Sequence, residues 1–149
     1  RLGINNTPDA ASLRNLIRLA ARLEEVREAV GHAVVISSGF RCKKLNDVTS
    51  GSSKTSAHMT GCAADIKAPL SLMTPTYLLK SFMEIIEASH DKVLVFDQLI
   101  WEYGRWIHFG IENECQTPRR QLLMKFTAPK NYLPFDIRRI DPRTGQLLR

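Results

Sequence analysis

The stretch from Ser56 to Asp65 constrains the fold more than any other part of the sequence. It has the sequence Ser-Ala-His-Met-Thr-Gly-Cys-Ala-Ala-Asp, which puts His58 and Asp65 seven positions apart. A metal-binding pair on one helical face is spaced four positions apart, so these two residues do not share a helix. Gly61 and the small residues before Asp65 favour a turn that enters a strand, with one polar side chain at each end.

Histidine nitrogens and carboxylate oxygens are both zinc ligands, and a catalytic zinc has three protein ligands and one open position. The best remaining histidine is His108, which lies in the segment Trp106-Ile107-His108-Phe109-Gly110. We therefore predict that His58, Asp65 and His108 hold one zinc ion. For each residue alone an alternative stays open: a structural pair of His58 with Asp65, and a hydrogen-bonded core histidine at position 108.

Apolar residues that recur at three- and four-residue steps predict two helices. The first begins near Thr7 as its N-terminal cap and ends at Gly31, and the second spans about residues 74–90. The face of the first helix that we expect to be buried includes Leu13, Leu16, Ile17, Ala20, Leu23 and Val26. Strands are predicted at 33–36 and 62–66, and residues 122–126 fit either an edge strand or a short helix.

Residues 93–111 predict two strands around the loop Tyr103-Gly104-Arg105. The apolar residues of both strands are odd-numbered, so one common core face requires an odd-length loop, with Gly104 at positive φ. In that register Glu102 lies opposite Trp106, and Glu102 emerges on the same face as His108. A carboxylate beside a metal-binding histidine can act as a general base toward water.

Arg41 follows a predicted strand and the turn Ser37-Ser38-Gly39-Phe40. Such an arginine can point into a cleft and bind a carboxylate through two parallel hydrogen bonds. A surface arginine in a salt bridge is the alternative, and the residues alone do not choose between them.

The formal net charge of +6 favours polyanionic partners. We expect an anionic cell envelope and no nucleic acid, because the sequence has no nucleic-acid-binding motif. No window is apolar enough for a membrane span, and no signal segment precedes the first helix, although the chain starts at Arg1. Three cysteines (Cys42, Cys62 and Cys115) predict mostly buried thiols made in a reducing compartment, with one disulfide left open.

Three blocks of the sequence resemble the zinc D-alanyl-D-alanine carboxypeptidase family. They are Ser37-Ser38-Gly39-Phe40-Arg41, Ser56-x-His58-x-x-Gly61-x-Ala63-x-Asp65 and Trp106-x-His108, in the family's order. The same fold group includes phage L-alanyl-D-glutamate endolysins and the hedgehog signalling domain. The resemblance implies an α+β fold in which an antiparallel sheet with flanking helices holds zinc in a cleft. It implies a single domain over 1–149, with a core at about 4–127 and an Arg-rich C-terminal extension at 128–149.

The family's zinc ligands correspond to His58, Asp65 and His108. Its substrate-binding arginine corresponds to Arg41, and Ser56 is implied to hydrogen-bond the substrate. Several relatives have the catalytic acid three residues before the last histidine, where this chain has an arginine that cannot act as a base. We predict that Glu102 replaces it, and Glu112 and Asp97 are weaker candidates.

The expected activity is zinc-dependent hydrolysis of peptidoglycan stem peptides, in phage lysis or cell-wall remodelling. We expect a monomer, made in the cytoplasm, that acts on the cell wall in the host periplasm or as part of a virion. The alternative is a zinc-containing binding or virion structural module without catalysis. The position of Glu102 discriminates between the two, because a binding module needs no base beside the metal.

Overall fold

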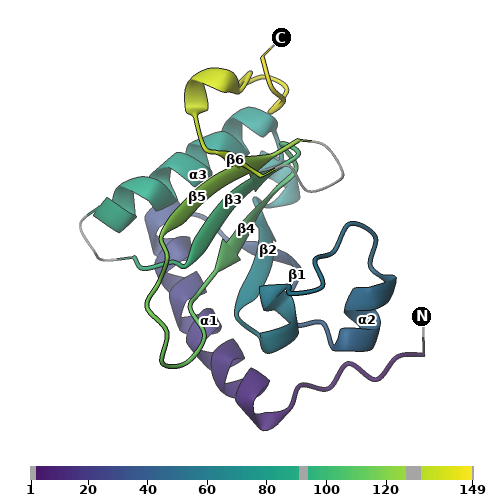
Figure 1. Ribbon diagram of the computed structural model, residues 1–149. Coiled ribbons are helices and arrows are strands. Elements are labelled where there is room, and N and C mark those ends of the chain that lie inside the picture. The colour runs from purple at the N-terminus through teal and green to yellow at the C-terminus, as the bar shows by residue number, and fades with distance from the viewer. Residues whose placement is uncertain (1–2, 91–93, 127–131, 149) are drawn as a thin grey trace.

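A six-stranded sheet has its two long helices on one face in the computed structural model, which describes residues 3–90, 94–126 and 132–148 (Figure 1). The helices are α1 (Ala10–Val30), α2 (Lys43–Val48) and α3 (Pro75–His90), with 3-10 turns η1 (Ala57–Thr60), η2 (Leu70–Leu72) and η3 (Ile137–Arg139). The strands are β1 (Val35–Ser38), β2 (Ala63–Lys67), β3 (Gln98–Glu102), β4 (Trp106–Gly110), β5 (Gln121–Lys125) and β6 (Leu133–Pro134).

The strand order is β1-β2-β4-β3-β5-β6, and every neighbouring pair is antiparallel except β3 and β5. The α+β class is confirmed, and the sheet is mixed rather than wholly antiparallel. Because β2 and β3 already occupy both edges of β4, the chain crosses over after β4 and pairs β5 with the free edge of β3. Residues 121–125 are therefore a strand, but an internal one, because β6 covers the outer edge of β5.

Helix α1 begins later than predicted. Its cap is Asp9 rather than Thr7, because the Asp9 carboxylate accepts a hydrogen bond of 2.7 Å from the backbone N–H of Ser12. The end at Gly31 is confirmed: this glycine has a φ of 68° and its N–H bonds the last turn of the helix.

The buried face of α1 also differs from the prediction in its first half, where Leu13 and Ile17 are exposed. The buried positions there are Ser12 and Asn15, which pack against the turn η1 instead of the apolar core. Asn15 Nδ2 donates to the carbonyl oxygen of Thr60 at 2.9 Å. Apolar spacing could not predict this face because its contacts are polar.

The main core lies between the sheet and the two helices α1 and α3. Alternation along β2 turns Cys62, Ala64 and Ile66 into this core, as predicted. Helix α3 contributes Phe82, which is fully buried against the indole of Trp101 on β3. The opposite face of the sheet has Asp65, Glu102 and His108 at the alternate positions, together with apolar residues such as Ile100 and Trp106.

The hairpin of β3 and β4 has the predicted register. Glu102 pairs with Trp106 across the three-residue loop, and Ile100 pairs with His108. Gly104 has a φ of 65°, as expected. Residue 93 of the predicted segment lies outside the described residues.

The C-terminal residues 132–148 pack on the end of this hairpin, and the remaining residues of the predicted extension lie outside the described ranges. Trp101 Nε1 donates to the Gly145 carbonyl oxygen at 3.0 Å, and Gln146 Nε2 donates to the Tyr103 carbonyl oxygen at 2.6 Å. Gly104 and Gly145 approach so closely that a side chain on either would collide with the other. Among the described residues, no helix combines the length and apolarity required to cross a membrane.

Candidate metal centre

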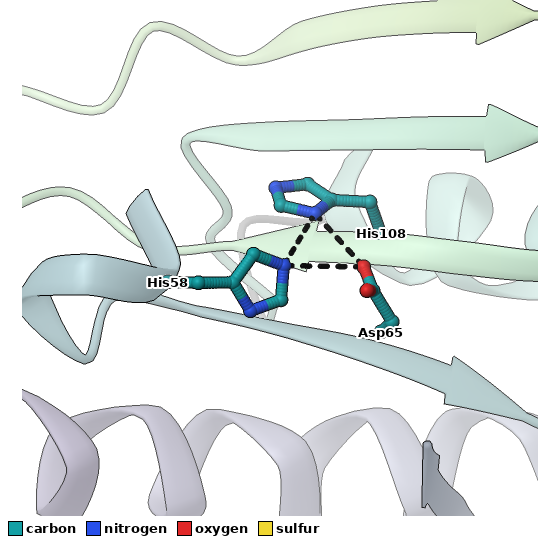
Figure 2. A group of neighbouring side chains, drawn as sticks. All are labelled: His58, Asp65 and His108. Atoms are coloured by element: carbon teal, nitrogen blue, oxygen red, sulfur yellow. Dashed lines mark hydrogen bonds and ion pairs between the residues drawn. The ribbon is translucent and has the colours of Figure 1, made fainter. Parts of the chain in front are cut away.

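Three elements that are distant in sequence bring His58, Asp65 and His108 together (Figure 2). His58 lies in η1, where the hydroxyl of Ser56 accepts a hydrogen bond from the His58 backbone N–H, and the turn ends at Gly61. Asp65 on β2 and His108 on β4 are direct partners in the sheet register. Both side chains project from the sheet face that lies opposite the helices, and the side chain of His58 from η1 meets them there.

The three facing atoms form a nearly equilateral triangle. His58 Nε2 is 3.3 Å from Asp65 Oδ1 and 3.3 Å from His108 Nδ1, and the last two atoms are 3.1 Å apart. Ligands about 2.1 Å from a tetrahedral zinc lie about 3.4 Å from one another. The triangle therefore has the size of one face of a zinc coordination tetrahedron, which leaves the fourth position for a non-protein ligand.

The hydrogen bond on the far side of the His58 ring fixes its tautomer. Nδ1 lies 2.8 Å from the Gly39 carbonyl oxygen, which can only accept, so Nδ1 has the proton. Burial lowers the pKa of His58, so its Nε2 presents a lone pair to the Asp65 carboxylate and to His108. At most one proton, on His108 Nδ1, then lies between the three atoms that face one another. A metal cation bound by the three atoms would satisfy this arrangement.

Burial by itself would raise the pKa of Asp65, but the imidazoles of His108 and His58 outweigh it and hold that pKa well below its usual value. The carboxylate is therefore ionised at neutral pH. An anionic oxygen beside two imidazole nitrogens is a donor set that suits zinc.

Arg41 lies at the edge of this cluster and not on the outer surface. Its backbone N–H donates to the His58 carbonyl oxygen, Nη1 donates to Ser38 Oγ at 2.8 Å, and Nη1 is 3.9 Å from Asp65 Oδ2. Its Nε is buried and has no partner within the described residues. Burial lowers the pKa of Arg41 although Asp65 opposes the shift. Of the two alternatives, this position favours a carboxylate-binding arginine. Ser56 Oγ lies 3.5 Å from Nη2 of the same arginine.

Glu102 lines the same cleft and is 8% exposed. Burial raises the pKa of Glu102, and the charges of His108 and Lys125 offset this only in part. A carboxylate with a raised pKa in a cleft has the properties of a general acid and base. The two weaker candidates are bound elsewhere: Glu112 pairs with Arg18.

The other weak candidate, Asp97, is held by Arg119, whose guanidinium binds both carboxylate oxygens and whose backbone N–H donates to one of them. This pair fixes the loop that leads into β5. Asp97 is therefore engaged in a structural ion pair and does not compete for the role of base.

The cleft has a volume of about 420 Å³ and extends across the sheet from Arg41 to β5. The residues of its lining that sequence reasoning missed include Trp106, Lys125 and Tyr132. Alternation along β4 would have found Trp106, which is two residues before His108. Lys125 gave no local signal, because its position depends on the parallel pairing of β5 with β3.

The cysteines correct one expectation. Only Cys62 is buried, whereas Cys42 is half-buried and Cys115 is exposed. All three are free thiols, so the disulfide left open by the sequence is not formed. None of them belongs to the metal-ligand cluster.

Comparison with known proteins gives one family. The model of the family described as Peptidase M15 matches residues 1–110, a range that contains all three blocks of the sequence and the histidine–aspartate–histidine cluster. Searches of curated proteins and of solved structures return no match.

Proposed function

The chain belongs to the peptidase M15 family, and we propose that it is a zinc-dependent peptidase that hydrolyses stem peptides of peptidoglycan. Membership in this family implies a hydrolase that cleaves peptide bonds. The observation that supports the finer proposal most is the triangle of His58, Asp65 and His108, with Glu102 in the same cleft. We propose that these three residues hold one zinc ion and that Glu102 is the catalytic base.

The donor set fits zinc in distance, charge and tautomer. Zinc held there would act as a Lewis acid toward the scissile carbonyl and would make a bound water more acidic. The chain itself fixes the direction of the first ligand, because the Gly39 carbonyl oxygen accepts the proton of His58 Nδ1. Such a hydrogen bond on the far nitrogen orients a metal-binding imidazole and makes it more basic.

In the proposed reaction Glu102 accepts the proton of the attacking water and later donates it to the leaving amine. Its burial supports this cycle, because a carboxyl with a raised pKa can both accept and return a proton near neutral pH. Arg41 binds a substrate carboxylate through its guanidinium, which lies at the edge of the metal cluster in the cleft. Ser56, next to Arg41, adds a hydroxyl that can hydrogen-bond the substrate.

The charge of the cleft supports an anionic peptide substrate. Its lining has three cationic side chains (Arg41, Arg119 and Lys125) against two acidic ones (Asp65 and Glu102), and since Asp97 neutralises Arg119, a net positive charge comes with the bound metal. Stem peptides of peptidoglycan end in free carboxylates and are built partly from D-glutamate, so they match this charge. We propose that the protein acts as a monomer on the cell wall, in phage lysis or wall remodelling, and that its net charge of +6 favours an anionic envelope.

Digestion of purified muropeptides, followed by mass spectrometry, tests the proposal. The zinc-loaded protein should release shortened stem peptides, and a chelator should stop the release until zinc is restored. The mass of the products identifies the bond that is cut. Intact muropeptides after prolonged digestion with the zinc-loaded protein would reject peptidoglycan hydrolysis and favour the alternative of a binding module.

A further inference from the structure

Lys125 on β5 is buried in one wall of the cleft, and the proposed reaction gives it no role. It is 4% exposed, although lysine is rarely buried without a partner. Its ammonium lies 5.3 Å from the ring centre of Tyr103 and 5.0 Å from that of Tyr132. Two aromatic rings thus hold this cation at the cleft wall.

The ammonium is charged, and the neighbouring Glu102 acts on it without forming a close ion pair. Burial lowers the pKa of Lys125, but Tyr103 and Glu102 raise it by more, so the net shift is upward. Glu102 is its register partner on β3, yet Lys125 forms no ion pair within the described part of the chain. Arg119, by contrast, is bound to Asp97 and is 53% exposed. Lys125 is therefore a buried cation of the cleft that can still bind an anionic ligand, whereas Arg119 is already paired.

The sheet sets the distance between the two candidate anion-binding groups. Arg41 lies beside Asp65 on β2, whereas Lys125 is on β5, with β4 and β3 between them. Strands are spaced about 4.8 Å apart, so β2 and β5 are separated by about 14 Å. This gap equals about four residues of an extended peptide at about 3.3 Å each, and the hydrogen-bond distance from cation to anion at each end takes up part of it. The two cations therefore match anionic groups about three residues apart.

We propose that Lys125, held by Tyr103 and Tyr132, is a second carboxylate-binding subsite that selects peptides with two free carboxylates about three residues apart. This inference depends on the proposed peptidase function. Lys125 then binds the D-glutamate carboxylate while Arg41 binds the carboxylate at the end of the stem peptide. It also assigns a role to residues beyond the part of the chain that matches the family model.

Two synthetic pentapeptides test the subsite. One is L-alanyl-γ-D-glutamyl-L-lysyl-D-alanyl-D-alanine, and the other has D-isoglutamine, whose carboxamide replaces the free carboxylate. For the zinc-loaded wild-type protein we expect kcat/KM to favour the acid form by about tenfold or more, mainly through KM, as for a hydrogen bond to a charged group. In Lys125→Met this preference should fall to nearly one, and Lys125→Arg should restore most of it.

Lys67→Met is the matched control, because Lys67 is also a sheet lysine above an aromatic ring, 5.9 Å from the centre of Trp106. It should leave the preference unchanged. A purely structural role of Lys125 would lower kcat/KM for both peptides alike, and an unchanged ratio in Lys125→Met overturns the proposal.

Failure of the proposed function gives a different result. If the zinc-loaded wild-type protein hydrolyses neither peptide, calorimetry measures the binding of the same two peptides. A preference for the acid form that Lys125→Met removes would then support the subsite while the peptidase function fails. Equal binding of both peptides overturns the subsite.

Discussion

Asp65 and His108 face each other across the antiparallel strands β2 and β4, with 3.1 Å between Oδ1 and Nδ1. Direct partners in an antiparallel pair have Cβ atoms about 5 Å apart, so the register alone holds these two side chains together. His58 is added by a separate turn, which the Gly39 carbonyl oxygen orients from behind. The positions of two proposed ligands thus depend on the sheet, and the position of the third depends on how η1 packs.

The first prediction concerns the charge at the centre of this cluster. Asp65→Asn keeps the shape of the side chain but removes the anionic oxygen that faces both imidazoles. We expect zinc affinity to fall by more than about 100-fold, since loss of a mere outer-shell partner already costs 10–100-fold. Competition with a chromophoric chelator measures this. Asp97→Asn is the matched control and should bind zinc as the wild type does. Wild-type affinity in Asp65→Asn would remove this residue from the ligand set.

The second prediction separates catalysis from metal binding. Glu102→Gln should lower kcat by about 10²–10⁴-fold, the usual contribution of a general base, while zinc affinity stays unchanged. Hydrolysis of stem peptides and zinc titration of the same preparation provide the two measurements. His58→Ala should lose both. Full activity in Glu102→Gln would assign the base to another residue.

The sequence predicted the hairpin register and the shared face of Glu102 and His108 for a physical reason. Odd-numbered apolar residues and a three-residue loop fixed one register, and that register puts Glu102 and His108 on the same face. Alternation likewise placed Cys62 and Ala64 in the core and Asp65 outside it. Local patterns suffice where the contacts are between neighbours in the chain.

The remaining features depend on non-local contacts. Lys125 reaches the cleft only because β5 pairs in parallel with β3, and no local pattern predicts which strand a distant segment will join. The first half of α1 was assigned the wrong buried face because Ser12 and Asn15 pack against the turn of η1. Polar contacts of this kind have no hydrophobic period.

The third prediction is a stability cost of the buried base in the metal-free protein. Burial raises the pKa of Glu102 above the value of about 4.3 in an unfolded chain. As the pH rises through that value, the unfolded chain ionises while the folded chain keeps the proton, so the stability of the folded state falls. Glu102→Gln lacks this penalty. We expect the variant to be more stable than the wild type at pH 7.

Urea unfolding at several pH values measures the difference. The gain in the free energy of unfolding should shrink as the pH falls and disappear below about pH 4, where both states of the wild type are protonated. A gain of constant size at every pH would have a cause other than the charge of Glu102.

The last prediction links the packing of α1 to the metal centre through Gly61. This glycine ends η1 with a φ of 73°, and a Cβ built on it would lie 2.5 Å from the backbone oxygen of Ser12 in α1. Gly61→Ala must therefore push η1 away from the helix, and His58 moves with it because the Gly61 N–H bonds the His58 carbonyl oxygen. We expect a loss of about 3 kcal/mol in the free energy of unfolding and weaker zinc binding.

Gly51 is the matched control, since it has a φ of 74° but open space where a Cβ would be. Gly51→Ala should cost about 1 kcal/mol, the strain of the left-handed conformation alone, and should leave zinc affinity unchanged. The difference between the two alanine variants isolates the collision with Ser12 from backbone strain. Equal losses of stability, with zinc binding intact in both, would show that η1 is not held against α1 at Gly61. The position of His58 would then have to depend on its own hydrogen bonds to the Gly39 carbonyl oxygen, the Arg41 backbone N–H and the Ser56 hydroxyl.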